Sequence, residues 1–353
     1  MSTPETFLRL LQAPGPSGRE AAASAVFREA ASSFADEVEG DLVGSSTARV
    51  KGKPGDRTLA IVGHIDEIGL IVSHIEEKGF LRFQQVGGWD PVVLIGQRVA
   101  ITGRDGKTVP GVIARKPIHL METDERGKSA KIKDLHIDIG ANDADDAKTL
   151  IRVGDVGVIA VDPLDLPNGR LASRAMDNRV GCFVALEAAR LVSEAGGAAF
   201  DVVAVAASQE ETSLGGAKTV THRLRPDVAI AVDVTFATDQ PGVTTGELTD
   251  SPLGSGPSIT RGTNLHPVVS DGLVETAEAN KIEHTLAAEG RGTSTDADAI
   301  NISRDGVPTG LVSVPLRYMH SPVEVVQISD IEAAARLIAD YALSLPADID
   351  FNR

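Results

Sequence analysis

DVVAVAASQEET, residues 201–212, joins an apolar run to two adjacent carboxylates, Glu210 and Glu211. The run Val202–Ala207 is typical of a strand buried on both faces, as in sheets that helices cover on both sides. In open α/β sheets, functional sites form at the carboxyl ends of strands. Two adjacent acids repel each other at low dielectric unless a cation accepts them. The segment therefore predicts an α/β fold with a candidate site beyond this strand, the alternative being a solvated acidic loop.

Apolar strands and amphipathic stretches alternate on both sides of this segment. Upstream, TLAIVGHID is a short apolar strand that ends in His64 and Asp66, and downstream Val228–Val232 ends at Asp233. This alternation implies a mixed or mostly parallel sheet covered by helices. The patterns predict helices after Thr3-Pro4, from a capping box at 17–20, after Asp177, and over Leu273–Asn280, Thr295–Ile302 and Asp330–Leu345.

Residues 69–162 have a different texture. Short β-like runs such as LIVSHI, RVAITG and GDVGVIAV alternate with glycine turns, and only 142–150 resembles a helix. This pattern is typical of a small β-barrel or β-sandwich. We expect such a domain to be inserted into an α/β catalytic domain made of residues 1–68 and 163–353.

The composition narrows the class of protein. A chain of 353 residues suits two domains, and 42% hydrophobic with 24% charged residues is typical of globular proteins. The formal net charge of −16 argues against nucleic acid as a partner, because an acidic chain repels phosphate backbones. Aromatic residues make up only 3%, which leaves little material for stacking bases or sugars.

Neither a membrane nor a secretory route is predicted. No apolar stretch approaches the ~20 residues that span a bilayer, and MSTPETFLRLLQ lacks the basic and apolar regions of a signal peptide. The single cysteine, Cys182, excludes an intramolecular disulfide and fits a reducing compartment. We therefore expect a cytoplasmic protein with Cys182 in its core, on the apolar run 180–189, rather than as a nucleophile.

Five candidate metal ligands lie where an apolar strand ends or just beyond. They are His64 after LAIVG, Asp177 after GRLASRAM, Glu211 after the strand at 202–207, Asp233 after VAIAV and His320 after VSVPLRYM. Two imidazoles and three carboxylates suit a pair of divalent metals such as zinc, cobalt or manganese. One carboxylate must bridge to bring two metals within about 4 Å. Asp177, on a loop before a helix, is the natural candidate.

Each candidate also has a structural explanation when it is taken alone. His64 could be a structural histidine, although Asp66 is placed to fix the tautomer of a metal-bound imidazole. Asp177 could cap a helix, Asp233 could terminate a strand, and His320 could occupy a turn. The remaining histidines have no comparable pattern, and we expect no metal role for His74, His119, His136, His222, His266 and His284.

Five sequence blocks, taken in order, carry a family resemblance. GHIDEIGLIV, SRAMDNRVGC, SQEETSLGGA, VDVTFATD and RYMHSPVEVV resemble the glutamyl aminopeptidase family of di-metal exopeptidases, the tetrahedral (TET) aminopeptidases, some of which are labelled endoglucanases. The resemblance covers essentially the whole chain, and no ligand position is substituted. Ile65 replaces the family's usual Met, and Phe236 stands where the family often has His, near the substrate side.

The resemblance assigns roles to these residues. It implies that one metal is held by His64, Asp177 and Asp233, and the other by Asp177, Glu211 and His320. It implies further that Glu210 is the general base, which takes a proton from a water shared by the metals, and that Asp66 orients His64. Two divalent ions per subunit, zinc foremost, would be the cofactors.

The resemblance also implies a function and an assembly. The chain would remove N-terminal residues from short peptides, and it would self-associate through residues 69–162 into dimers and a hollow tetrahedral dodecamer. A di-metal deacylase of small acylated amino acids or dipeptides would have the same ligands. A glycoside hydrolase needs two acids and no metals, usually with aromatic platforms, so two histidines in ligand positions argue against it. A catalytically inactive assembly protein would not keep every ligand and the base.

Overall fold

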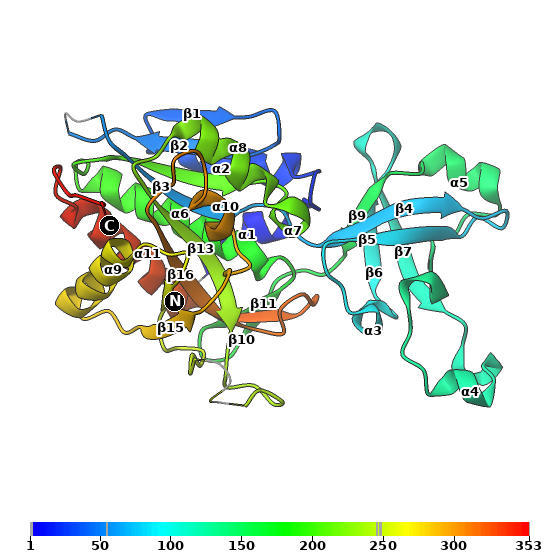
Figure 1. Cartoon of the computed structure of the whole chain (residues 1–353). Helices are drawn as coiled ribbons and strands as arrows, with labels where there is room; N and C mark the ends of the chain where they lie inside the picture. The colour runs from blue at the N-terminus through cyan, green and yellow to red at the C-terminus, as the bar shows by residue number, and fades with distance from the viewer. Residues whose placement is uncertain (1–2, 54–55, 245, 247–248, 353) are drawn as a thin grey trace.

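In the computed structural model, a large helix-covered sheet lies beside a smaller closed barrel that projects from one side of it (Figure 1). The structure describes residues 3–53, 56–244, 246 and 249–352. The predicted fold class, a mixed α/β sheet covered by helices with an inserted β domain, is confirmed. The sequence pattern does not distinguish a β-barrel from a β-sandwich for this inserted domain. The structure shows a closed barrel.

The large sheet is mixed, with parallel strands at its centre. Within the described residues its main path follows the order β1 (Glu37–Gly40), β2 (Ser46–Val50), β12 (Asp201–Ala207), β3 (Thr58–His64), β13 (Val228–Phe236), β16 (Thr309–Arg317), β17 (Glu324–Gln327), β11 (Arg170–Ser173) and β10 (Leu164–Leu166). Two further strands, β14 (Ser258–Gly262) and β15 (Thr285–Glu289), extend from β16. Because β12, β3, β13 and β16 run parallel, their carboxyl ends share one edge.

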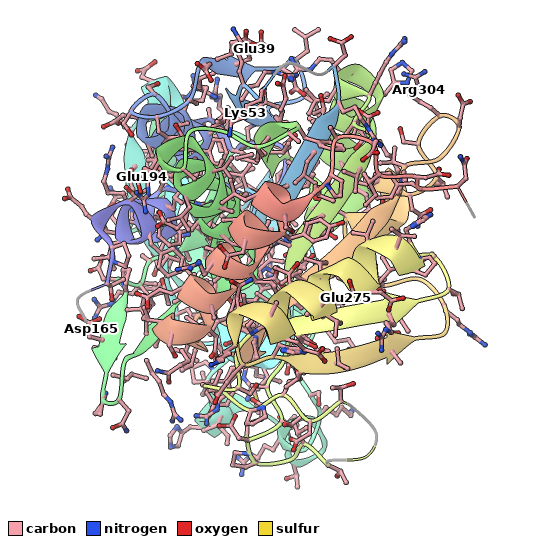
Figure 2. All side chains as sticks on the ribbon, turned by 90° about the vertical axis from the view of Figure 1, so that its left-hand side faces the viewer. Glu39, Lys53, Asp165, Glu194, Glu275 and Arg304 are labelled. Atoms are coloured by element: carbon pink, nitrogen blue, oxygen red, sulfur yellow. The ribbon has the colours of Figure 1, made fainter. Side chains whose placement is uncertain are left out.

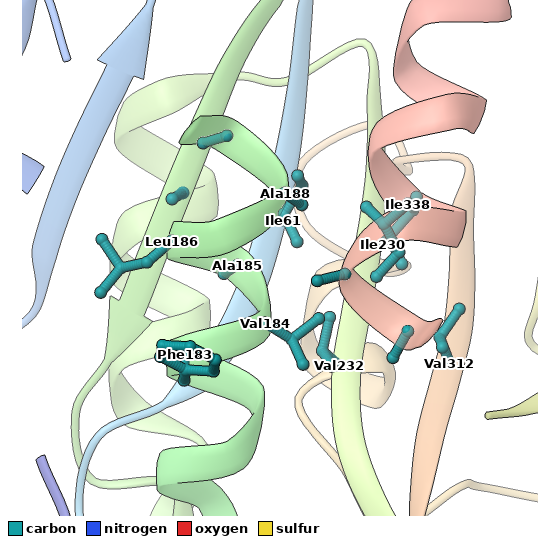
Figure 3. Close-up of a cluster of buried hydrophobic side chains, with 14 of the residues drawn as sticks. Ile61, Phe183, Val184, Ala185, Leu186, Ala188, Ile230, Val232, Val312 and Ile338 are labelled. Atoms are coloured by element: carbon teal, nitrogen blue, oxygen red, sulfur yellow. The ribbon is translucent and has the colours of Figure 1, made fainter. Parts of the chain in front are cut away.

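Helices bury both faces of this sheet. One face meets α1 (Glu5–Gln12), α2 (Ala21–Ala31), α6 (Met176–Glu194), α9 (Pro267–Asn280) and α11 (Ile328–Ser344), and the other meets α8 (Gly215–Leu224) and α10 (Ala297–Ile300). Along β3, the Ile61 side chain packs in the core on the α6 side of the sheet, and the Val62 side chain packs in the core on the α8 side. This alternation is expected for a strand buried on both faces. Figure 3 shows Val184 of α6 pointing toward Val232 of β13.

A close backbone contact sets the position of α6 beside the end of β3. A Cβ added at Gly63 would lie 2.4 Å from the carbonyl carbon of Gly181. Only glycine allows this approach. Helix α6 thereby brings its first turn, which contains Asp177, beside His64 at the end of β3.

The barrel contains six antiparallel strands: β4 (Gly69–Ile75), β5 (Leu81–Val86), β6 (Arg98–Thr102), β7 (Thr108–Arg115), β8 (Leu135–Asp138) and β9 (Val156–Ile159). Its connections include α3 (Pro91–Leu94), α4 (Thr123–Arg126) and α5 (Ala144–Leu150). It has a core of its own, with Leu70, Phe83 and Ile101 buried in its interior. Closure removes the exposed edges that an open sheet of this size would present.

Several predicted boundaries differ from the structure. Strand β13 continues to Phe236, so that Asp233 lies inside a strand rather than at its end. Helix α9 begins at Pro267 rather than Leu273. The predicted capping box is wrong: α2 has no side-chain cap, because the Glu20 carboxylate accepts hydrogen bonds from the backbone of Gly18 and Gln209 instead.

The outside of the large α/β domain carries many charged side chains. Glu39, Glu194, Glu275 and Arg304 are exposed on the face shown in Figure 2. Cys182 is buried in the main core, as predicted, and burial raises the pKa of its thiol to about 12. Among the residues that the structure describes, no helix has both the length and the apolar composition needed to cross a membrane.

Candidate functional site

The structure brings the five predicted ligands together at the carboxyl edge of the large sheet. His64 ends β3, Asp177 lies in the first turn of α6, and Asp233 lies in β13. Glu211 belongs to a short helix, α7 (Glu210–Ser213), that follows β12, and His320 lies in the turn after β16.

Asp177 is the centre of this cluster. Its Oδ1 atom is 3.0 Å from Nε2 of His64, and its Oδ2 atom is 3.4 Å from Nε2 of His320. The same His320 nitrogen is 3.4 Å from Oε1 of Glu211. The two oxygens of Asp177 therefore face different imidazoles, which is the arrangement that a bridging carboxylate requires.

Among the residues that the structure describes, two overlapping groups of donor atoms could each hold an ion. Donor atoms of His64, Glu210 and Asp233 all lie within 4.8 Å of one another, as do those of His64, Asp177 and Glu211. The first group includes Glu210, where the resemblance places Asp177 instead. Both carboxylates of the Glu210–Glu211 pair thus point into the cluster, with Oε2 of Glu210 3.7 Å from Nε2 of His64.

Asp66 contacts both His64 and the Glu210–Glu211 turn. Its Oδ1 and Oδ2 atoms accept hydrogen bonds from the backbone N–H groups of Glu210 and Glu211, at 3.0 and 3.1 Å. Nδ1 of His64 is 3.2 Å from the Asp66 carbonyl oxygen and 3.6 Å from its carboxylate. The buried Asp66 carboxylate therefore contacts the imidazole of His64 and the backbone N–H groups of Glu210 and Glu211.

Burial and mutual repulsion perturb the acids of this cluster. Burial raises the pKa of Glu210 to about 9, with further increases from Asp233 and Glu211 and a decrease from His64. Burial also raises the pKa of Asp233 well above its usual range. Burial would raise the pKa of Asp177 too, but its hydrogen bonds with His320 and His64 lower it overall.

The imidazoles respond in the opposite sense. Burial disfavours a charged His64, but Glu210, Asp177 and Asp66 together raise its pKa well above the usual range. The interactions of His320 with Asp177 and Glu211 raise its pKa to about 11. In the absence of other cations, the cluster must therefore bind protons to offset its buried negative charge.

Divalent cations fit this donor set. The cluster offers imidazole nitrogens and carboxylate oxygens, which are the ligands of zinc, cobalt and manganese sites. A metal ion bound to these atoms would supply the positive charge that the buried acids lack. The residues present therefore fit a metal centre.

A glycine pair from the barrel domain borders the cluster. A Cβ at Gly88 would lie 3.2 Å from Nδ1 of His320, and one at Gly87 would lie 3.1 Å from Oε2 of Glu211. A cavity of about 10 Å³, lined in part by Trp89, Glu211 and His320, lies between the barrel and the cluster. The barrel thus forms one wall beside the candidate ligands.

Among the described residues, Glu324 and Asp296 are buried acids near the cluster that the sequence patterns do not predict. Glu324, 2% exposed, accepts hydrogen bonds from the backbone N–H groups of Asp177 and His320. Asp296 is also 2% exposed, and burial raises its pKa to about 7. Glu324 lies inside the quoted block RYMHSPVEVV, but no local pattern separates it from an ordinary strand residue.

The groups of donor atoms found among the described residues contain none of the six histidines that were expected outside the site. One of them, His266, helps to line a much larger cavity of about 720 Å³ at the opposite edge of the sheet, where β3, β13 and β16 begin. Cavity size therefore does not mark the candidate site in this molecule.

Comparison with known proteins assigns the family. Residues 44–337 match the family described as M42 glutamyl aminopeptidase. The chain belongs to the M42 aminopeptidase family. Its members are metal-dependent peptidases, so the chain is a hydrolase of the aminopeptidase class.

Individual M42 relatives match along nearly their whole length. The chain is 33% identical to the lysyl aminopeptidase of Pyrococcus furiosus, with 94% of each chain covered. The structure of the TET aminopeptidase of a marine sediment archaeon, a member of the Thaumarchaeota, is 35% identical with a TM-score of 0.91, and the match covers 97% of this chain and 96% of that one. The TET1 peptidase of Pyrococcus horikoshii, described as assembling into a tetrahedron or a large octahedral shell, is 31% identical with a TM-score of 0.84, covering 97% and 99%.

Proposed function

We propose that this M42 chain is a di-metal aminopeptidase that removes N-terminal residues from short peptides. The observation that carries the proposal is Asp177, whose two oxygens face His64 and His320 separately. Two divalent ions per subunit, zinc foremost and cobalt or manganese as alternatives, would share this carboxylate. His64 and Asp233 would complete one site, and Glu211 and His320 the other.

When bound, the metals would lower the pKa of a water molecule and polarise the scissile carbonyl group. Glu210 would take the proton from that water and pass it to the leaving amine. Glu210 and Glu211 are adjacent in the chain and both carboxylates lie in the cluster. Glu210 can therefore move protons while Glu211 binds metal. Asp66 would keep this division, because its carboxylate holds the backbone N–H groups of both.

We propose that residues 1–68 and 163–353 form the catalytic domain and that residues 69–162 form a dimerisation domain. The tetrahedron described for the Pyrococcus horikoshii relative supports a tetrahedral assembly for this chain, which we expect to be a dodecamer. Enclosure in such a shell would favour short peptides as substrates. The single buried cysteine is in keeping with a cytoplasmic location.

The decisive experiment combines metal analysis with a substrate panel. The purified chain should contain two equivalents of divalent metal, lose activity in chelator, and regain it with zinc, cobalt or manganese. Aminoacyl-anilides with a free amine should be cleaved, whereas acyl-amino acids should not. Cleavage of acyl-amino acids alone would identify a deacylase, and chelator-insensitive sugar hydrolysis would identify a glycosidase; either result would overturn the proposal.

A further inference from the structure

Glu324 connects two of the candidate ligands through their backbones. It begins β17, four residues after His320, and it is 2% exposed. Its Oε1 atom accepts a hydrogen bond from the His320 N–H group at 2.8 Å, and its Oε2 atom accepts one from the Asp177 N–H group at 3.3 Å. One buried carboxylate therefore joins two segments that are far apart in the sequence.

The turn that carries His320 depends on such support. Both Tyr318 and His320 have left-handed backbone conformations, with φ of 62° and 57°. Side chains other than glycine rarely adopt this region, at a cost of roughly 1 kcal/mol each. The hydrogen bond to Glu324 stabilises the His320 N–H group in this conformation. This hydrogen bond thereby fixes the backbone position of His320 and the direction in which its imidazole faces Asp177.

A similar arrangement supports the other side of the cluster. Asp66 accepts hydrogen bonds from the backbone N–H groups of Glu210 and Glu211, much as Glu324 does for Asp177 and His320. Two buried carboxylates thus hold four site residues by their backbones. Such outer partners commonly affect metal affinity, because they orient the ligands themselves.

We propose that Glu324 is a positioning residue for the metal site formed by Asp177, Glu211 and His320. The inference rests on the proposed di-metal function. Glu324 would contribute to affinity at this site by holding the Asp177 and His320 backbones in register, without itself being a ligand.

Asp330 provides a matched control elsewhere in the same domain. This residue is 1% exposed, and its carboxylate accepts hydrogen bonds from the backbone N–H groups of Gly254 and Gly256, at 2.8 and 3.0 Å. Its chemistry is that of Glu324, but its partners carry no candidate ligand. Substitution of either acid should lower stability, whereas only Glu324 should affect metal binding.

The test is titration of metal-free protein with Co²⁺ and Zn²⁺, followed by calorimetry and by the visible absorption of bound cobalt. The Glu324→Gln variant keeps the size of the side chain but turns an amide NH₂ toward one backbone N–H group. We expect one of the two sites to bind about 10- to 100-fold more weakly and its cobalt spectrum to change. The Asp330→Asn variant should bind both metals with wild-type affinity, although its metal-free form unfolds at a lower temperature.

The Glu324→Asp variant keeps the charge but is too short to reach both N–H groups, and it decides the matter if Glu324→Gln does not fold. Wild-type affinity and spectrum in the folded Glu324 variants would overturn the inference. An equal loss of affinity in Asp330→Asn would overturn it as well, since the effect would then be general destabilisation. If the wild-type chain bound no metal, the proposed function itself would fail.

Discussion

Both edges of the large sheet carry polar and charged side chains, but the edges differ in the size of the neighbouring cavity and in how their charges are paired. At the amino edge, a cavity of about 720 Å³ is lined by Arg57 and Asp227 among others. At the carboxyl edge, His64 and Asp233 lie in a cluster with far less open space beside it, about 10 Å³. An argument from cavity size alone would choose the amino edge, away from the candidate ligands.

At the amino edge, Arg57 and Asp227 form an ion pair with each other. Nε of Arg57 is 3.5 Å from the Asp227 carboxylate, and its guanidinium donates to the carbonyl oxygens of Ala347 and Ile349. Asp227 also accepts a hydrogen bond from the Thr58 N–H group. At the carboxyl edge, by contrast, buried carboxylates outnumber the imidazoles. Bound cations would therefore be needed to neutralise them. Substitutions at the two edges should therefore have different consequences.

The largest effect on turnover is expected from Glu210→Gln at the carboxyl edge. The amide cannot accept the water proton, so the rate should fall by about 10²- to 10⁴-fold. Metal content should stay near two equivalents, because the proposed ligands are untouched. Peptidase assays and elemental analysis on the same sample provide the measurement, and loss of metal together with activity would contradict the division of roles between Glu210 and Glu211.

The gathering of these acids at one edge follows from patterns that the sequence displays. The apolar runs before His64 and before Glu210 predict buried strands, and parallel strands bring their carboxyl ends to the same edge. In the structure, His64 is the register partner of Ala207, so β3 and β12 end side by side. The strand patterns, together with the family resemblance, are therefore enough to predict the fold class and which residues lie together.

Other features depend on contacts between distant segments, which no local pattern reports. The hydrogen bonds of Glu324 require the 318–320 turn and the first turn of α6 to meet. The approach of Gly88 to His320 requires the barrel to lie against the cluster. The extension of β13 past Asp233 is not predicted, because a charged residue after an apolar run is typical of the end of a strand.

The next largest effect is expected from His320→Ala. This change removes a proposed ligand and leaves Asp177 and Glu211 without the imidazole that faces both. Metal affinity at one site should fall by about 100-fold or more, since even indirect partners cost 10- to 100-fold. The exposed His222, on α8, offers a control: His222→Ala should retain both metals and full activity. Full metal occupancy in His320→Ala would remove this residue from the ligand set.

A smaller effect is expected where the barrel meets the carboxyl edge. In Gly88→Ala, the new methyl group would lie 3.2 Å from Nδ1 of His320, so the imidazole must shift by a few tenths of an ångström. Overpacking of this kind costs about 1 kcal/mol or more, and activity should fall by about 10-fold. Gly127→Ala, at a barrel position with no atom within 4 Å of the new methyl group, should behave as wild type. Equal activity in the two variants would show that the barrel wall does not constrain His320.

The smallest effect on turnover is expected from Arg57→Ala at the amino edge. This change removes two hydrogen bonds to the C-terminal segment, at 3.1 and 2.8 Å, and the stacking of the guanidinium 4.6 Å from the Phe200 ring centroid. Because the side chain is 27% exposed, we expect a loss of about 1–2 kcal/mol in the free energy of unfolding. Metal content and peptidase rate should stay at wild-type values below the unfolding transition. Thermal unfolding followed alongside activity tests this, and a fall in catalytic rate or metal affinity without unfolding would show that the two edges are coupled. In that case both edges of the sheet would influence the candidate metal site, and they would differ only in the size of that influence.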